Sequence, residues 1–142
     1  MKARGTLRPR EAFISHASAD RRFADRFSLM LGKHGVPFWY SRTNIQGAQQ
    51  WHDEIGEALR RCDTFIVLLS PVSVKSKWVR HELMYALREA QFENRIVPLL
   101  IRKCDPSRLS WTLPGFQIVD FSRNFDSGCR ELLRSWGLGF KP

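Results

Sequence analysis

The chain has 142 residues, of which 43% are hydrophobic and 12% aromatic, and its formal net charge is +9 at pH 7. This length suits one domain, and the composition excludes a disordered or fibrous chain. No apolar run approaches the roughly 20 residues of a membrane-spanning helix, and the start, MKARGTLRPREAF, lacks the apolar segment of a secretory signal. We therefore expect a cytoplasmic protein without a membrane partner.

The basic residues are scattered, apart from a local excess in residues 1–10, which we expect to form a flexible arm. A basic surface attracts anions, but this scatter does not single out nucleic acid, and we expect no nucleic-acid partner for the domain itself. The three cysteines, Cys62, Cys104 and Cys129, show no metal-ligand spacing. We expect reduced, mostly buried thiols and no bound metal.

Short apolar runs alternate with helical patterns from the start of the chain. Residues 11–15 predict a first strand, and Ser18 is a candidate N-cap for the next helix, with Asp20 in its first turn. Residues 36–40 predict a second strand. The polar residues 41–50 then form a loop that is long for this kind of connection.

The alternation continues to the end of the chain. Residues 63–70 are almost continuously apolar, as in a strand that is buried on both faces. The remaining predicted elements are a helix from Trp51, a helix over 77–92, strands over 95–101 and 116–121, and a helix from about Asp126 to Trp136.

Strands and helices in this order predict an α/β fold of the flavodoxin-like, doubly wound type, with a five-stranded parallel sheet covered by helices on both faces. Ligands of such folds bind beyond the carboxyl ends of the strands. This rule selects the loops after Ser15, Tyr40, Ser70 and Ile101.

The helix predicted over 77–92 carries an unusual ridge. Trp78, Glu82 and Tyr85 follow the i, i+4, i+7 rule beside the apolar stripe of the helix. Spacing alone favours an ordinary arrangement, in which Trp78 packs on the sheet and Glu82 faces water. The alternative is that the ridge lines a cleft, where the aromatic ring stacks on a planar group and the carboxylate meets a developing positive charge.

Two loops hold further candidates. Ser15 and His16 end the first strand and precede small residues, which let a ligand approach the backbone. Arg42 in the 41–50 loop could contact a phosphate. A plain strand–helix turn and a solvated loop are the ordinary alternatives. The motifs GxGxxG, GxxxxGK[ST] and GxSxG are absent from the sequence, which disfavours a Rossmann oxidoreductase, a P-loop NTPase and an α/β-hydrolase.

Three blocks occur together and in order: FISHASAD, GAQQWHDEIGEALRRCD and LLSPVSVKSKWVRHEL. With them the chain resembles a Toll/interleukin-receptor (TIR) domain, closest to the bacterial and plant-type branch that cleaves NAD+. The resemblance covers about residues 11–136, which leaves the arm 1–10 and a tail, 137–142. It implies a five-stranded parallel sheet with helices on both sides.

The resemblance also implies an activity and its residues. Glu82 matches the catalytic glutamate of the family, and Trp78 matches the tryptophan that stacks on the substrate. Ser15 and His16 border the cleft, Arg42 is a looser match in the BB loop, and Tyr85 shares the ridge of Glu82. The candidate substrate contacts are therefore Trp78, Ser15, His16, Arg42 and Tyr85. Asp20 and Glu54 are helper carboxylates that the sequence does not place.

The implied function is an NAD+ glycohydrolase (NAD+ nucleosidase) that releases nicotinamide and ADP-ribose or a cyclic isomer, with NAD+ as substrate and no cofactor. The resemblance implies activation by self-association into a homo-oligomer or filament, a fused or separate sensor module, and an effector role in bacterial antiphage defence. The alternative is a non-catalytic adaptor that binds other TIR domains through the 41–50 loop.

Overall fold

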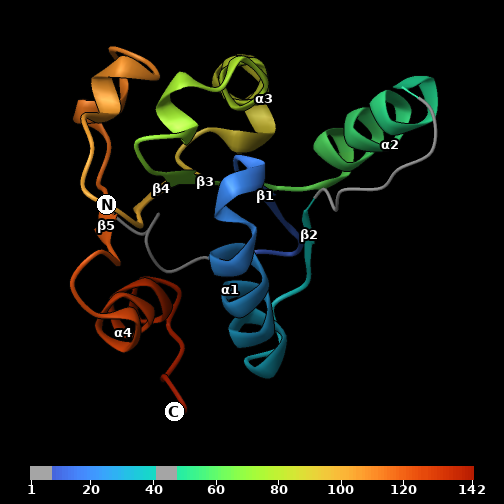
Figure 1. Cartoon of the computed structure of the whole chain (residues 1–142). Coiled ribbons are helices and arrows are strands. Elements are labelled where there is room, and N and C mark those ends of the chain that lie inside the picture. Colours follow the sequence, from blue (N-terminus) through green and yellow to red (C-terminus); the bar gives the residue numbers. More distant parts are fainter. Residues whose placement is uncertain (1–7, 41–47) are drawn as a thin grey trace.

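A computed structural model gives the structure of the protein and describes residues 8–40 and 48–142. Within these residues, five strands form one parallel sheet of order β2-β1-β3-β4-β5 (Figure 1). The strands are β1 (Ala12–Ser15), β2 (Phe38–Tyr40), β3 (Thr64–Leu69), β4 (Ile96–Leu100) and β5 (Val119–Asp120). The α-helices are α1 (Arg21–Lys33), α2 (Ala48–Arg61), α3 (Lys77–Arg88) and α4 (Phe125–Ser135). In the described part of the chain, no helix is long and apolar enough to span a membrane.

Helices cover both faces of the sheet, because successive side chains of a strand point to opposite sides. Ile14, Ile66 and Leu68 pack against buried side chains of α1 and α4. Phe13, Phe65 and Val67 belong to a second cluster with α2 and α3 on the other face. Figure 1 shows this division of the helices. The predicted doubly wound, five-stranded parallel sheet is therefore confirmed.

The strand order places a topological switch point between β1 and β3. The chain leaves β1 to form β2 on one side and then returns to form β3 on the other, where Ser15 is in register with Val67. In doubly wound folds, the crevice beyond the carboxyl ends of the strands at such a point is the usual place for a ligand.

Several predicted elements differ in length from what was expected. α2 begins at Ala48, inside the loop predicted over 41–50, and β2 begins two residues later than the strand predicted over 36–40. The strand predicted over 116–121 is reduced to Val119–Asp120, which pairs only with Leu99 and Leu100 of β4. β4 contains Pro98 just before these residues, and proline cannot donate a ladder hydrogen bond. The helix predicted over 77–92 ends at Arg88, because Glu89 is extended and a short 3₁₀ turn follows.

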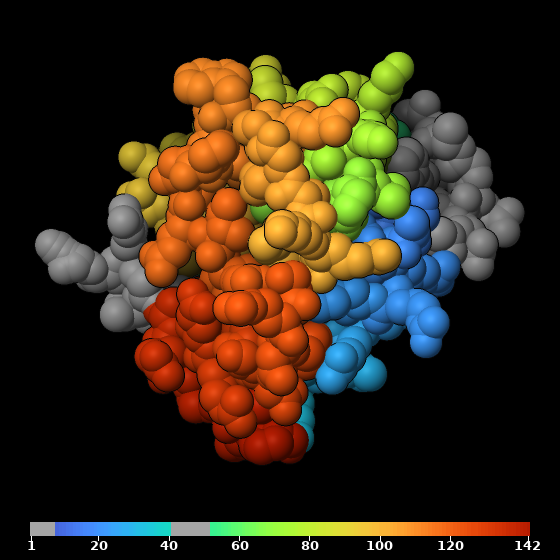
Figure 2. Space-filling model, turned by 60° about the vertical axis from the view of Figure 1, so that its left-hand side comes forward, coloured from blue at the N-terminus to red at the C-terminus, as the bar shows by residue number. Residues whose placement is uncertain are grey.

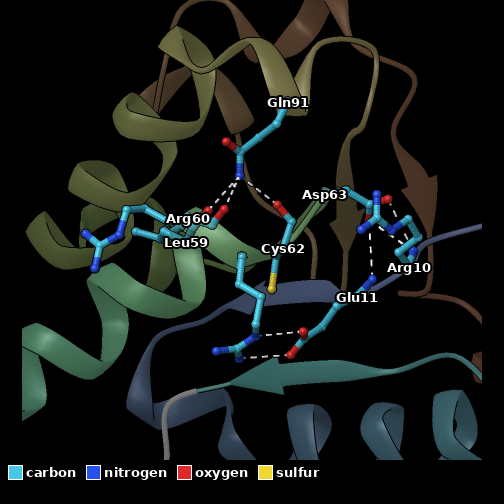
Figure 3. Close-up of polar contacts among 8 residues, drawn as sticks. Arg10, Glu11, Leu59, Arg60, Cys62, Asp63 and Gln91 are labelled. Atoms are coloured by element: carbon cyan, nitrogen blue, oxygen red, sulfur yellow. Dashed lines mark hydrogen bonds and ion pairs between the residues drawn. The ribbon is translucent and has the colours of Figure 1, made fainter.

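The carboxyl end of α2 is fastened to the sheet region by side chains (Figure 3). The Gln91 amide nitrogen donates to the carbonyl oxygens of Leu59 at 2.9 Å, Arg60 at 3.0 Å and Cys62 at 2.7 Å. Arg61 forms two hydrogen bonds, of 2.8 and 2.9 Å, to the Glu11 carboxylate beside β1. Gln91 thereby satisfies carbonyls that the end of a helix leaves without intrahelical partners.

Candidate functional site

The centre of the candidate site is a buried pair formed by Ser15 and Glu82. Ser15 ends β1 and is 1% exposed, whereas Glu82 lies in the second turn of α3 and is 5% exposed. The Ser15 hydroxyl donates a 2.5 Å hydrogen bond to Glu82 Oε1. The arrangement in which Glu82 faces water is therefore wrong, because its carboxyl group points at the carboxyl end of β1.

Local sequence fixes the start of α3 and thereby the direction of this side chain. The Ser76 hydroxyl caps the helix by accepting a hydrogen bond from the Val79 N–H at 3.2 Å. Val79 and Leu83 are fully buried, and Glu82 lies three residues after the first and next to the second. Glu82 therefore lies on the inward side of the helix.

Burial changes the acidity of this carboxyl group. It raises the pKa of Glu82 from 4.5 to about 7, and hydrogen bonding from Ser15 and from the Trp78 side chain opposes the increase. Both the protonated and the ionised form of Glu82 are therefore accessible near neutral pH. A carboxyl group that titrates near pH 7 at the ligand-binding edge of a doubly wound sheet is a typical mark of a functional site.

The ridge predicted on α3 exists, but its three members have different surroundings. Trp78 lies one turn before Glu82 and packs partly against the core on the α2–α3 side. Its ring centroid is 6.4 Å from that of His52 and 6.1 Å from that of His81. Tyr85 is half-buried in the same apolar cluster. The structure thus joins Trp78 to Glu82 and places Tyr85 further along α3.

His16 follows Ser15 at the same edge of the sheet. Its Nδ1 lies 2.8 Å from the Ala17 carbonyl oxygen, and its ring centroid is 5.8 Å from that of Tyr40, which ends β2. Arg42 and residues 41–47 of the predicted loop lie outside the described residues, and their assignment stays a prediction. Glu54, a proposed helper, is exposed on α2.

The structure adds a polar cluster that the sequence did not define. Asp20 is 2% exposed, and its carboxylate accepts hydrogen bonds from the Ser70 hydroxyl at 2.5 Å and from Arg102 Nη2 at 3.4 Å. The prediction that Ser18 is the N-cap of the following helix is wrong, since Ser18 begins a short 3₁₀ turn and Asp20 occupies the N-cap position of α1. The Asp20 side chain makes no capping hydrogen bond there. A usable signal existed, because Ser70 ends one predicted strand and Arg102 directly follows another.

The described residues contain no group of three or more histidine, cysteine, aspartate or glutamate side chains that could hold a metal ion. Cys62 and Cys129 are buried and Cys104 is half-buried. Burial raises the pKa of both Cys62 and Cys129 to about 12, which keeps these two thiols protonated and unreactive.

Comparison with known proteins identifies the family. The model of the TIR domain family matches residues 12–133, and the chain belongs to this family. The TIR domain of the Toll-related receptor TRR-2 from Hydra magnipapillata has the same fold, with a TM-score of 0.70 and 21% identity over 89% of this chain and 97% of that one. The TIR domains of the activated Roq1 resistosome, which recognises the pathogen effector XopQ, give a TM-score of 0.66 and 16% identity, covering 87% and 97%.

Two curated relatives carry enzymatic names. The NAD(+) hydrolase TcpC of Escherichia coli O6:H1 is 30% identical over 87 residues, which are 60% of this chain and 28% of TcpC. The probable 2' cyclic ADP-D-ribose synthase TcpO of Methanobrevibacter olleyae is 24% identical over 91 residues, which are 63% of this chain and 27% of TcpO. The chain thus matches little more than a quarter of the length of these relatives.

Proposed function

We propose that this domain is an NAD+ glycohydrolase, which cleaves the bond between nicotinamide and ribose. The observation that carries the proposal is the buried Glu82 carboxyl group, held by Ser15 beside Trp78 at the carboxyl edge of the sheet. The names of TcpC and TcpO support the same class of substrate and reaction. NAD+ is a substrate here, and the reaction as proposed uses no cofactor.

The leaving group sets what the enzyme must supply. Nicotinamide is a pyridinium cation in NAD+, and it departs neutral when the electron pair of the C1′–N bond moves to its nitrogen. No general acid is needed. The ribose then acquires oxocarbenium character, and a carboxylate beside it stabilises that charge, as in glycoside hydrolysis. Glu82 takes this role, and its buried position strengthens the electrostatic interaction.

Water adds to C1′ and loses a proton to give ADP-ribose, whereas attack by a nitrogen of the adenine gives a cyclic isomer. Only the ionised form of Glu82 stabilises the cation. Ser15 holds one carboxylate oxygen and fixes the orientation of the side chain, which makes it a positioning residue rather than a direct substrate contact. Trp78 stacks on the nicotinamide ring.

The burial of Glu82 also supports regulation. At 5% exposure the carboxyl group cannot meet a ribose without movement of the residues around it. We propose that packing of copies of the domain into a homo-oligomer or filament produces this opening, on a signal from a fused or separate sensor module. The resemblance to bacterial members extends the proposal to an effector of antiphage defence in the cytoplasm. Infection of cells that carry Glu82→Ala tests that role, since the variant should not protect them.

The decisive experiment incubates purified protein with NAD+ and separates the products by chromatography. A concentration series with and without a crowding agent is required, because dilute monomer is expected to be slow. Wild type should release nicotinamide, and Glu82→Gln should not, while the two proteins give the same circular dichroism spectrum. Full turnover by Glu82→Gln would show that the assignment is wrong. Absence of NAD+ loss from assembled wild type would favour the adaptor alternative.

A further inference from the structure

The second buried carboxylate lies where three loops meet. Asp20 comes from the loop after β1, Ser70 follows β3, and Arg102 follows β4. The Asp20 side chain has 0% exposure, whereas that of Arg102 is 64% exposed. An ionised carboxylate that is removed from water requires a cation or several donors nearby. Arg102 is the basic side chain that the structure places in contact with Asp20.

The geometry of Arg102 is not that of a simple counter-ion. A guanidinium group has five N–H donors and usually meets a carboxylate through two parallel hydrogen bonds. Arg61 does so with Glu11, at 2.8 and 2.9 Å. Arg102 reaches Asp20 with one nitrogen at 3.4 Å, although Asp20 is far more buried than Glu11. The Arg102 side chain is 64% exposed, so its remaining donors are accessible from solvent.

The position of Arg102 in the fold places its guanidinium donors near the candidate site. The backbone of Arg102 and of Ile101 is fixed by N–H bonds to the Leu69 carbonyl oxygen, of 3.4 and 3.0 Å. The guanidinium group therefore lies at the carboxyl edge of the sheet, the edge that also carries Ser15 and Glu82. β3 separates β1 from β4, so the ends of these strands are about 10 Å apart, within the reach of an extended dinucleotide.

The exposed residues near Arg102 are basic as well. Arg22, at the start of α1, and Lys103, beside Arg102, are both exposed. Figure 2 shows the segment after β4, in gold and orange, against the first residues of α1, in blue. Asp105 is the nearest exposed acid in this loop, and its carboxylate already accepts hydrogen bonds from Ser107 at 3.1 and 2.7 Å.

We infer that Arg102, positioned by Asp20, binds the pyrophosphate of the substrate. The inference rests on the proposed NAD+ glycohydrolase function and deepens it by naming a second anchoring point. A planar guanidinium group with solvent-accessible donors matches two phosphate oxygens, and its positive charge persists at every physiological pH. Arg42, the phosphate contact predicted from the sequence, lies outside the described residues, and Arg102 stands independently of it.

Calorimetric titration with ADP-ribose tests the inference without requiring catalysis. Wild type should bind ADP-ribose measurably. Arg102→Gln should weaken binding at least about tenfold, the loss of one charge-assisted hydrogen-bonded contact. Arg134→Gln, which removes the same charge from an exposed position on α4, should bind as wild type does. Adenosine lacks the pyrophosphate, and its binding should be the same in wild type, Arg102→Gln and Arg134→Gln.

Arg102→Gln removes the ion pair with the buried Asp20 and can unfold the domain. Arg102→Lys keeps the charge but loses the planar fork, so it should fold and still bind ADP-ribose several-fold more weakly than wild type. Equal ADP-ribose affinity in wild type and a folded Arg102 variant overturns the inference, even if NAD+ is cleaved. Binding of ADP-ribose that depends on Arg102, without NAD+ cleavage by assembled protein, would instead keep the site and reject the glycohydrolase function.

Discussion

Substitution of Glu82 by glutamine should stabilise the domain at alkaline pH. The pKa of Glu82 is about 7 in the folded protein, against 4.5 for the unperturbed group. Between these two pH values, the folded state keeps a proton that the unfolded state has released. The wild type therefore loses stability as pH rises through this window. At 1.36 kcal/mol per pH unit, the loss is about 3 kcal/mol by pH 8. Glutamine does not titrate, so the Glu82→Gln variant avoids this loss of stability.

Urea unfolding of both proteins between pH 4 and pH 8.5 measures this effect. The difference in unfolding free energy, Glu82→Gln minus wild type, should increase by about 3 kcal/mol over the range, which is roughly 10 °C in Tm. Comparing the two proteins at each pH cancels the titration of all other groups. Glu54→Gln, an exposed glutamate on α2, should give a difference that does not change with pH. A pH-independent difference for Glu82→Gln would show that its carboxyl group is not desolvated in the fold, and the reasoning would fail.

Three further predictions follow from individual contacts. The kcat for NAD+ should rise with pH through about 7, because the reaction requires ionised Glu82. Ser15→Ala should move this rise to higher pH, because it removes a hydrogen bond that lowers the pKa of Glu82. A pH–rate profile that is the same in Ser15→Ala and wild type would contradict the positioning role of Ser15. An alanine Cβ at Gly128 would lie 2.6 Å from the ring of Phe121, so Gly128→Ala should cost about 1–3 kcal/mol in urea unfolding. Gln91→Ala should cost about 1 kcal/mol in urea unfolding and speed hydrogen exchange near the end of α2, since the partly buried carbonyls of Leu59 and Cys62 lose their donor. Unchanged exchange would mean that water replaces the amide.

The sequence by itself determined the order of the elements and the family of the protein. β3 was identifiable because a strand covered on both faces must be apolar at nearly every position, and its six residues are all buried. The length of the short strand β5 was overestimated, because the sequence shows Pro98 but does not give the register that places it just before the residues of β4 that pair with β5. A local sequence pattern predicts the type of an element well, but it predicts poorly how many residues of a strand pair with the neighbouring strand.

Only the tertiary structure decided where the candidate residues lie and which groups they contact. Spacing placed Glu82 one position from the core stripe, where a helix residue can face either water or the sheet. The choice depended on Ser15, which is 67 residues away. The sequence pattern placed Asp20 in the first turn of a helix, where it would act locally. In the structure Asp20 is buried and accepts a hydrogen bond from Ser70, which is 50 residues away in the chain. A carboxylate takes its direction and its pKa from the donors and the burial around it, and folding brings these together from segments far apart in the chain.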